Sequence, residues 1–233
     1  MLELAITAAT GLAAASFAGY HAMAPTSQLY GSALTRGANP RQLALTYDDG
    51  PNDPHTLRLL DVLAKHDVRA TFFLVGRYVQ QRPQIVRDLV QAGHVLGNHT
   101  FTHPNLIFCS ELQTRIQLSE CSRAIEDATG QSPKLFRPPF GGRRPSTLRI
   151  VRELGMEPVM WSVMGWDWEE KPASYIEGKV SSQIKGGDIL LLHDGGHRQM
   201  GADRSQTVIA TDNLITRYKA EGYSFVTVPE LVK

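Results

Sequence analysis

The sequence predicts an α/β fold, a distorted (β/α) barrel with about seven parallel strands. Apolar runs of strand length alternate with helical patterns over residues 42–233, and this alternation favours right-handed βαβ units around a parallel sheet. Seven or so units in about 190 residues fit a barrel better than an open six-stranded sheet. Polar residues follow five of the predicted strands, at the end where parallel barrels carry their active sites.

The first half supplies three strands and three helices. Strands are expected where short apolar or β-branched runs occur, at residues 42–47, 70–75 and 94–97. Helices are expected over 54–66, where leucines recur at helical spacing, over 83–92, which begins at Pro and ends at Gly93, and over 110–129, capped by Ser110 and ended by Gly130.

The second half repeats this alternation. Strands are expected at residues 134–136, 158–162, 188–192 and 224–228. Helices are expected at 145–154, 173–184 and 203–220, the first two closed by glycines. There is no sequence repeat beyond this rhythm, so residues 42–233 are interpreted as one domain.

Composition is ordinary for a globular protein, with 42% hydrophobic and 20% charged residues and a formal net charge of +1. Basic stripes and aromatic platforms are missing, which argues against a nucleic-acid partner. Cys109 and Cys121 would lie about 18 Å apart if one helix connects them, too far for a disulfide. We therefore expect reduced, structural cysteines.

The N-terminal segment, residues 1–24, is apolar and carries no charge between residues 4 and 20. That stretch is near the lower limit for a membrane span and long for the core of an export signal. An uncleaved anchor, a cleaved signal and a soluble Ala-rich helix are the three interpretations. The first two place the domain outside the cytoplasmic membrane, the first with membrane contact through residues 4–20. Residues 25–41 are interpreted as a linker.

Two histidines, His99 and His103, are separated by four positions and followed by Pro104. On a helical turn they would share one face and could bind one metal ion, whereas in a strand they would lie about 13 Å apart. A solvated turn is the alternative. His193 and His197 have the same spacing, but the glycines between them disfavour a helix, so this pair is not interpreted as metal ligands.

Two adjacent carboxylates, Asp48 and Asp49, follow the first predicted strand. Such a pair is costly to hold together without a cation. One carboxylate can complete a site with two histidines, and the other is then free to act as a base. The alternative is a surface turn, since Asp-Gly-Pro-Asn is a turn sequence.

With these residues the chain resembles the polysaccharide deacetylase family, also called the NodB-homology domain or carbohydrate esterase family 4. Five family motifs occur in family order between residues 42 and about 228. The matching residues are Thr46-Tyr47-Asp48-Asp49-Gly50, His99-Thr100-Phe101-Thr102-His103, Arg137-Pro138-Pro139-Phe140, Asp167-Trp168 and Leu191-Leu192-His193.

The resemblance implies a barrel fold and hydrolysis of the acetamide of N-acetylglucosamine units. It implies one divalent metal ion held by Asp49, His99 and His103, zinc first, with cobalt, nickel or manganese as alternatives. Peptidoglycan and chitin-like chains are the implied substrates.

The resemblance also implies how the other motif residues act. Asp48 would be the general base and His193 the general acid that protonates the leaving amine. Arg137 would hold Asp48, Asp167 would orient His193, and the backbone N–H of Phe140 would help to bind the oxyanion. These roles suit the chemistry, because amide hydrolysis needs an activated carbonyl and a protonated leaving group.

The sequence departs from the family pattern in three places. Tyr47 replaces the commoner Phe, Phe140 replaces the commoner Tyr, and the fourth motif lacks the earlier Asp near Met164, which leaves Asp167 as the orienting carboxylate. Trp168 is expected to line a sugar cleft, while Trp161 is expected in the core.

The expected function is therefore a metal-dependent polysaccharide N-deacetylase. An acetyl-ester or small-amide hydrolase on the same scaffold and a non-catalytic carbohydrate-binding relative are the alternatives. A metalloprotease is disfavoured because no Glu follows the first histidine. His55, His66 and His94 are interpreted as structural, and Asp194 as either a loop cap or a site residue.

Overall fold

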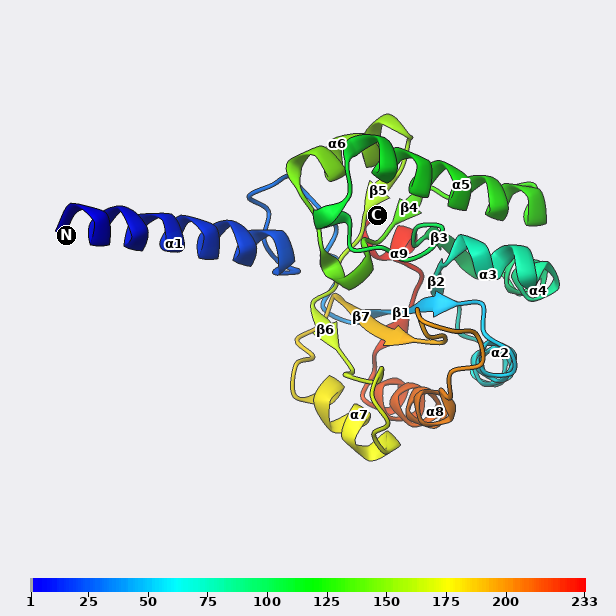
Figure 1. Cartoon of the computed structure of the whole chain (residues 1–233). Helices are drawn as coiled ribbons and strands as arrows, with labels where there is room; N and C mark the ends of the chain where they lie inside the picture. Colours follow the sequence, from blue (N-terminus) through cyan, green and yellow to red (C-terminus); the bar gives the residue numbers. More distant parts are fainter. Residues whose placement is uncertain (1) are drawn as a thin grey trace.

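The computed structural model describes the backbone of residues 2–233 and the side chains of residues 13–233. One sheet runs through the molecule, and all its strand pairings are parallel (Figure 1). Its order is β5-β4-β3-β2-β1-β7-β6, with β8 beside β1. The strands are β1 Gln42–Gly50, β2 Thr71–Leu74, β3 Val95–Asn98, β4 Leu135–Phe136, β5 Glu157–Pro158, β6 Val163–Met164, β7 Asp188–His193 and β8 Ser224–Phe225. The predicted distorted (β/α) barrel is confirmed.

Of the helices, α1 precedes the first strand and lies apart from the sheet, and most of the others follow strands and cover the outside of the curled sheet (Figure 1). They are α1 Leu2–Met23, α2 His55–Lys65, α3 Gly76–Gln81, α4 Pro83–Gln91, α5 Glu111–Thr129, α6 Pro145–Glu153, α7 Ala173–Ser181, α8 Ser205–Ala220 and α9 Val228–Leu231, with the short 3-10 helices η1 Leu106–Phe108 and η2 Pro139–Gly141. Helix α5 begins at Ser110, whose hydroxyl accepts from the Gln113 N–H, and Gly130 closes it in the left-handed conformation, as predicted.

The main core lies between the central strands and helices α2 and α8. Strand β1 is buried along almost its whole length, which explains its continuous apolar run. Its Leu43, Leu45 and Tyr47 pack in one cluster with Leu59 of α2 and Leu214 of α8. Burying a leucine side chain contributes roughly 1.5–3 kcal/mol, so this cluster is the main source of stability.

Residues 158–162 do not form the single strand that the sequence predicts. Strands β5 and β6 lie at opposite edges of the sheet, and the chain between them crosses the open seam of the barrel. In this seam Leu34 forms a parallel bridge with Val159, and Arg36 forms an antiparallel bridge with Asp188. Residues 25–41, interpreted as a linker, thus contribute two bridges to the barrel wall.

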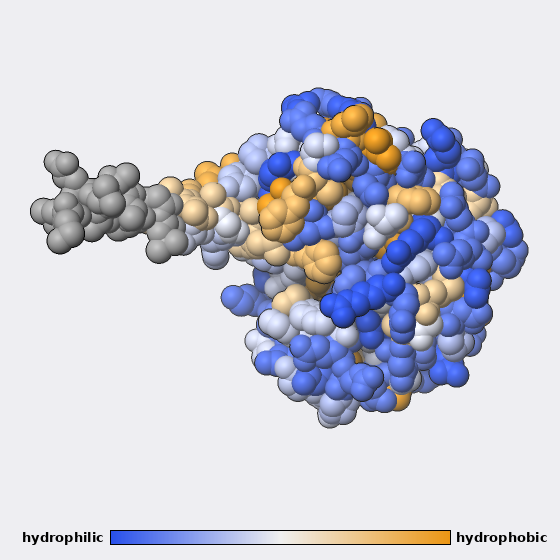
Figure 2. Space-filling model, in the orientation of Figure 1, coloured by the Kyte–Doolittle hydropathy of each residue, from blue (hydrophilic) through white to orange (hydrophobic). Residues whose placement is uncertain are grey.

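Helix α1 projects from the body, and Figure 2 shows apolar surface where its end meets the domain. Arg143, fully buried, holds this junction: its guanidinium donates to the carbonyl oxygens of Ala24 and Ser27 at 2.8 Å each. None of the helices searched within the described residues combines the length and apolar character of a membrane span. Side chains are described only for the second half of residues 1–24, so the predictions that depend on residues 1–12 lie outside the described side chains. Cys109 and Cys121 are free, as predicted.

Candidate metal centre and catalytic groups

Asp49, His99 and His103 converge at the carboxyl end of the central strands. One ligand atom from each lies within 4.8 Å of the others. The Asp49 Oδ1 atom is 3.2 Å from His103 Nε2 and 3.6 Å from His99 Nε2. Among the described residues this buried oxygen has no hydrogen-bond partner. One carboxylate oxygen and two imidazole nitrogens are a donor set that suits zinc and leaves positions open for water or substrate.

The protonation states of these residues also suit a cation. Burial lowers the pKa of His99 to about 3 and lowers that of His103 still further, so both imidazoles are neutral at pH 7. A neutral imidazole is the form that binds metal. His99 Nδ1 lies 2.8 Å from the carbonyl oxygen of Arg137, a contact that directs Nε2 towards Asp49. Burial destabilises the charged form of Asp49 and raises its pKa to about 6, and a bound cation would offset this destabilisation.

The two histidines lie on a loop, and the predicted helical turn is wrong. Thr100 and His103 adopt positive φ angles of 66° and 62°, which fold the loop back on itself. Asn98 accepts a hydrogen bond from the Thr100 N–H, and the Gln117 side chain on α5 accepts from the Thr102 N–H, both at 2.8 Å. Side-chain contacts therefore bring the histidines together where helical periodicity does not.

Asp48 points to a different partner from its neighbour Asp49. The register of β1 against β2 shifts between Asp48 and Gly50, and Asp49 has a φ of 74°, so the two carboxylates diverge. Arg137, fully buried, donates to Asp48 Oδ1 at 2.8 Å and to the Thr46 hydroxyl at 2.7 Å. Burial raises the pKa of Asp48, and the positive charge of Arg137 opposes that rise.

His193 and Asp167 form a second buried pair. The His193 Nδ1 atom lies 2.8 Å from Asp167 Oδ1, and the His193 N–H donates to Asp167 Oδ2 at 2.8 Å. The Thr207 hydroxyl also donates to Asp167. Burial alone would lower the pKa of His193, but the charge and hydrogen bonds of Asp167 outweigh it and, with Asp49 and Asp48, raise the pKa to about 9. His193 is therefore protonated at neutral pH.

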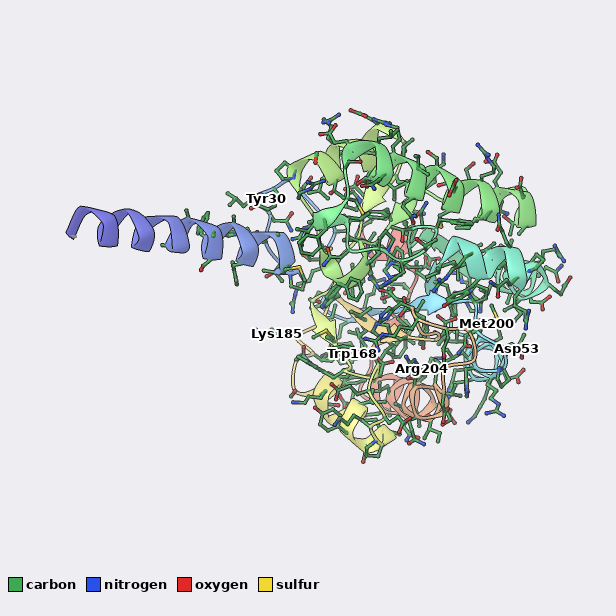
Figure 3. All side chains as sticks on the ribbon, viewed as in Figure 1. Tyr30, Asp53, Trp168, Lys185, Met200 and Arg204 are labelled. Atoms are coloured by element: carbon green, nitrogen blue, oxygen red, sulfur yellow. The ribbon has the colours of Figure 1, made fainter. Side chains whose placement is uncertain are left out.

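One cleft of about 930 Å³ is lined by Asp48, Asp49, His99, His103 and His193, while Arg137 and Asp167 lie behind its wall. Phe140 lines one part of it, with a φ of 59° that tilts its backbone in the η2 turn. Trp168 lines another part, and Figure 3 shows it beside β6 with Arg204 near the start of α8. Trp161 is buried in a core cluster, as predicted, yet it also lines the cleft.

The sequence interpretation missed the residues that hold the loop from Gly195 to Arg204 over the site. His197 of this loop stacks on His103, with ring centroids 4.7 Å apart and planes at 22°. Asn52, interpreted as a turn residue, is buried, and its amide donates to the carbonyl oxygens of Asp194 and Ala202. These contacts join segments more than 140 positions apart, and no local pattern signals them.

The three histidines interpreted as structural, His55, His66 and His94, do not line the cleft, and neither does Asp194, which was interpreted as either a loop cap or a site residue. Asp194 is fully buried and accepts from the Thr56 hydroxyl at 2.5 Å. His66 has a partner, since its Nε2 lies 2.5 Å from Asp212 Oδ1. His94 Nδ1 accepts from the Ala70 N–H at 3.1 Å.

Comparison with known proteins agrees with this arrangement. The family model for polysaccharide deacetylase matches residues 35–159. A peptidoglycan-N-acetylglucosamine deacetylase of Bacillus cereus is 36% identical over 87% of this chain and 72% of its own. A chitooligosaccharide deacetylase of a Bradyrhizobium strain is 38% identical over 82% of this chain and 90% of its own.

Solved structures show the same likeness. A peptidoglycan N-acetylglucosamine deacetylase superposes with a TM-score of 0.80 and 35% identity, covering 85% of this chain and 92% of that one. A carbohydrate esterase family 4 pseudoenzyme of Bacillus anthracis also gives 0.80, with 33% identity, covering 87% and 69%. The family model matches more than half of this chain, and these relatives match most of it. The chain therefore belongs to the polysaccharide deacetylase family, carbohydrate esterase family 4.

Proposed function

We propose that this protein is a metal-dependent N-deacetylase that hydrolyses the acetamide of N-acetylglucosamine units in peptidoglycan or a chitin-like chain, outside the cytoplasmic membrane. The observation that carries the proposal is that Asp48, held by the buried Arg137, and His193, held by the buried Asp167, face the same cleft as the Asp49, His99 and His103 cluster. The relatives named above deacetylate peptidoglycan or chitooligosaccharides.

The three ligands suit one divalent ion, zinc first, which when bound would polarise the acetamide carbonyl and the attacking water. Asp48 then accepts a proton as the water oxygen bonds to the carbonyl carbon. Arg137 favours the ionised form of this carboxylate, against the effect of burial, and fixes it in position, because its guanidinium is buried against it.

Breaking the C–N bond requires a proton on the leaving nitrogen. His193 carries that proton at neutral pH and donates it, so that acetate and a free amine are the products. Asp167 fixes the ring through Nδ1, which leaves Nε2 as the donating atom. Within the described residues the Phe140 N–H makes no hydrogen bond, so it is free to donate to the oxyanion.

Family membership alone does not assign activity, because one structural neighbour is a pseudoenzyme and a mutant of it has restored activity. In this chain the base, the acid and the positioning partner of each are all present with hydrogen bonds of 2.8 Å. A protein that only binds carbohydrate needs no buried acid and base. This set of groups therefore favours an enzyme over the non-catalytic alternative.

The test is acetate release from chitooligomers and from peptidoglycan by the zinc-loaded protein, by chelated protein and by Asp48→Asn. Loss of the base should lower kcat by about 10²- to 10⁴-fold. Asp127→Asn, an exposed carboxylate of α5, is the matched control and should keep wild-type activity. Full activity in Asp48→Asn would remove Asp48 as the base. Faster release from acetylxylan than from chitooligomers would favour the ester hydrolase.

A further inference from the structure

Two tryptophans, Trp166 and Trp168, are exposed at the rim of the cleft. Their exposed fractions are 43% and 38%, large for residues of this size. Their ring centroids lie 5.0 Å apart with planes inclined by 37°, so the two rings pack against each other and their uncovered faces and edges form one exposed aromatic surface. Trp168 also lies against His193, with ring centroids 5.7 Å apart. The surface therefore begins beside the acid and leads away from it.

The backbone at Trp166 is in an unfavourable conformation that keeps its ring outside. Its φ is 58°, in the left-handed region that bulky residues rarely adopt. The next residue, Asp167, is buried and accepts hydrogen bonds from His193 and Thr207. The positive φ lets Asp167 turn inwards while the tryptophans on either side stay exposed. Glycine would adopt this turn without strain, so the turn itself does not require tryptophan.

The chemistry of the ligand follows from this surface. A β-linked N-acetylhexosamine chain presents flat faces of C–H bonds, which stack on aromatic rings, and Trp166 extends the aromatic surface outwards from Trp168, the ring that contacts His193. A small amide or a small acetyl ester bound at the reacting centre would be too short to contact Trp166. The exposed apolar rings beside a polar cleft mark a binding surface.

We propose that Trp166 and Trp168 form an aromatic platform that binds the sugar unit adjoining the reacting one, and that Trp166 makes the enzyme prefer oligomers long enough to cover it. This inference rests on the proposed function, and it adds a residue that sets the preferred chain length. Trp168 contacts the sugar nearest to His193, and Trp166 contacts the next unit along the chain.

The experiment measures binding of N-acetylglucosamine oligomers, from dimer to hexamer, by calorimetry with the zinc-loaded full chain in an Asp48→Asn background that stops turnover. Affinity should rise at the length that first reaches Trp166. Trp166→Gly should remove that step, a loss of about tenfold, or ~1.4 kcal/mol, confined to the longer oligomers. Trp166→Phe should keep most of the step. The matched control is Phe108→Ala, which removes an aromatic ring that is 84% exposed and does not line the cleft.

Trp166→Gly also separates binding from folding, because glycine suits the positive φ and the thermal midpoint should stay within a few degrees of wild type. An unchanged length dependence in Trp166→Gly would overturn the platform. An equal loss at every length would also overturn it, by showing that Trp166 acts through Asp167. If the wild-type chain deacetylates oligomers but shows no step, only the platform fails. If it neither binds nor deacetylates any oligomer, the proposed function fails with it.

Discussion

Asp167→Asn tests the acid most directly, because it removes one charge and leaves the shape of the side chain. Asp167 is the main group that raises the pKa of His193, acting against burial, which lowers it. Without that charge, burial becomes the dominant cause, and the pKa should fall to the ordinary imidazole value of about 6.5 or below. The acid form of His193 would then be lost at neutral pH.

The size of the effect follows from the two pKa values. With a pKa of about 9, roughly nine-tenths of His193 is protonated at pH 8. With a pKa of about 6.5, roughly 3% is protonated, so kcat/KM at pH 8 should fall about thirtyfold or more. Activity that needs the acid is present below the pKa and is lost as pH rises through it. The loss should therefore shrink as the pH falls towards 6.

The assay is the pH dependence of kcat/KM for a chitooligomer, together with a nuclear magnetic resonance titration of the His193 ring. A bound divalent cation offsets the pull of Asp49, so the basic limb of the wild type is expected at or below pH 9. Thr207→Val is the control, because it removes one hydrogen bond to Asp167 and no charge. A basic limb that stays at the wild-type pH in Asp167→Asn, with a uniform loss of rate, would refute the reasoning.

Three further predictions concern the metal, the N-terminal junction and the end of β1. His103→Ala should lower zinc stoichiometry, measured by elemental analysis, from about one per chain to near zero. Arg143→Leu should lower the free energy of unfolding by about 2 kcal/mol in urea, because it leaves two partly buried carbonyl oxygens unpaired; a change below about 0.5 kcal/mol would contradict this. Gly50→Ala should reduce both activity and thermal midpoint, since an added Cβ would lie 2.1 Å from the Asp194 carboxylate, and wild-type behaviour would show that this loop yields easily.

Much of the fold and of the candidate site could be predicted because each motif stands at the end of a strand. The alternation of strands and helices fixes which end of the barrel the motifs share, and five motifs then meet without any knowledge of loop shape. The sequence could not show how the loop of His99 and His103 folds. Its positive φ angles depend on the side chains of Asn98 and Gln117, and Gln117 belongs to a helix that begins eight positions after His103.

The open seam of the barrel could not be predicted from a local sequence pattern either. Residues 158–162 have the composition of a strand, but the sheet has an edge on each side of them. Val159 pairs with Leu34 instead of with a neighbouring strand, and Met160 and Trp161 pack into an interior cluster. A run of apolar residues reports burial, and here burial is achieved without a continuous ladder.

The spatial relation between the proposed base, Asp48, and the proposed acid, His193, follows from the sheet itself. Asp48 on β1 and His193 on β7 are direct register partners, so two side chains that are 145 positions apart in the chain lie side by side at one edge. Because side chains alternate along a strand, a slip of one residue would turn one of them to the opposite face. The buried apolar residues Leu45 and Leu190, which are also register partners, resist that slip. The packing of the strand interior therefore sets the distance between Asp48, proposed to take a proton from water, and His193, proposed to deliver a proton to the leaving nitrogen.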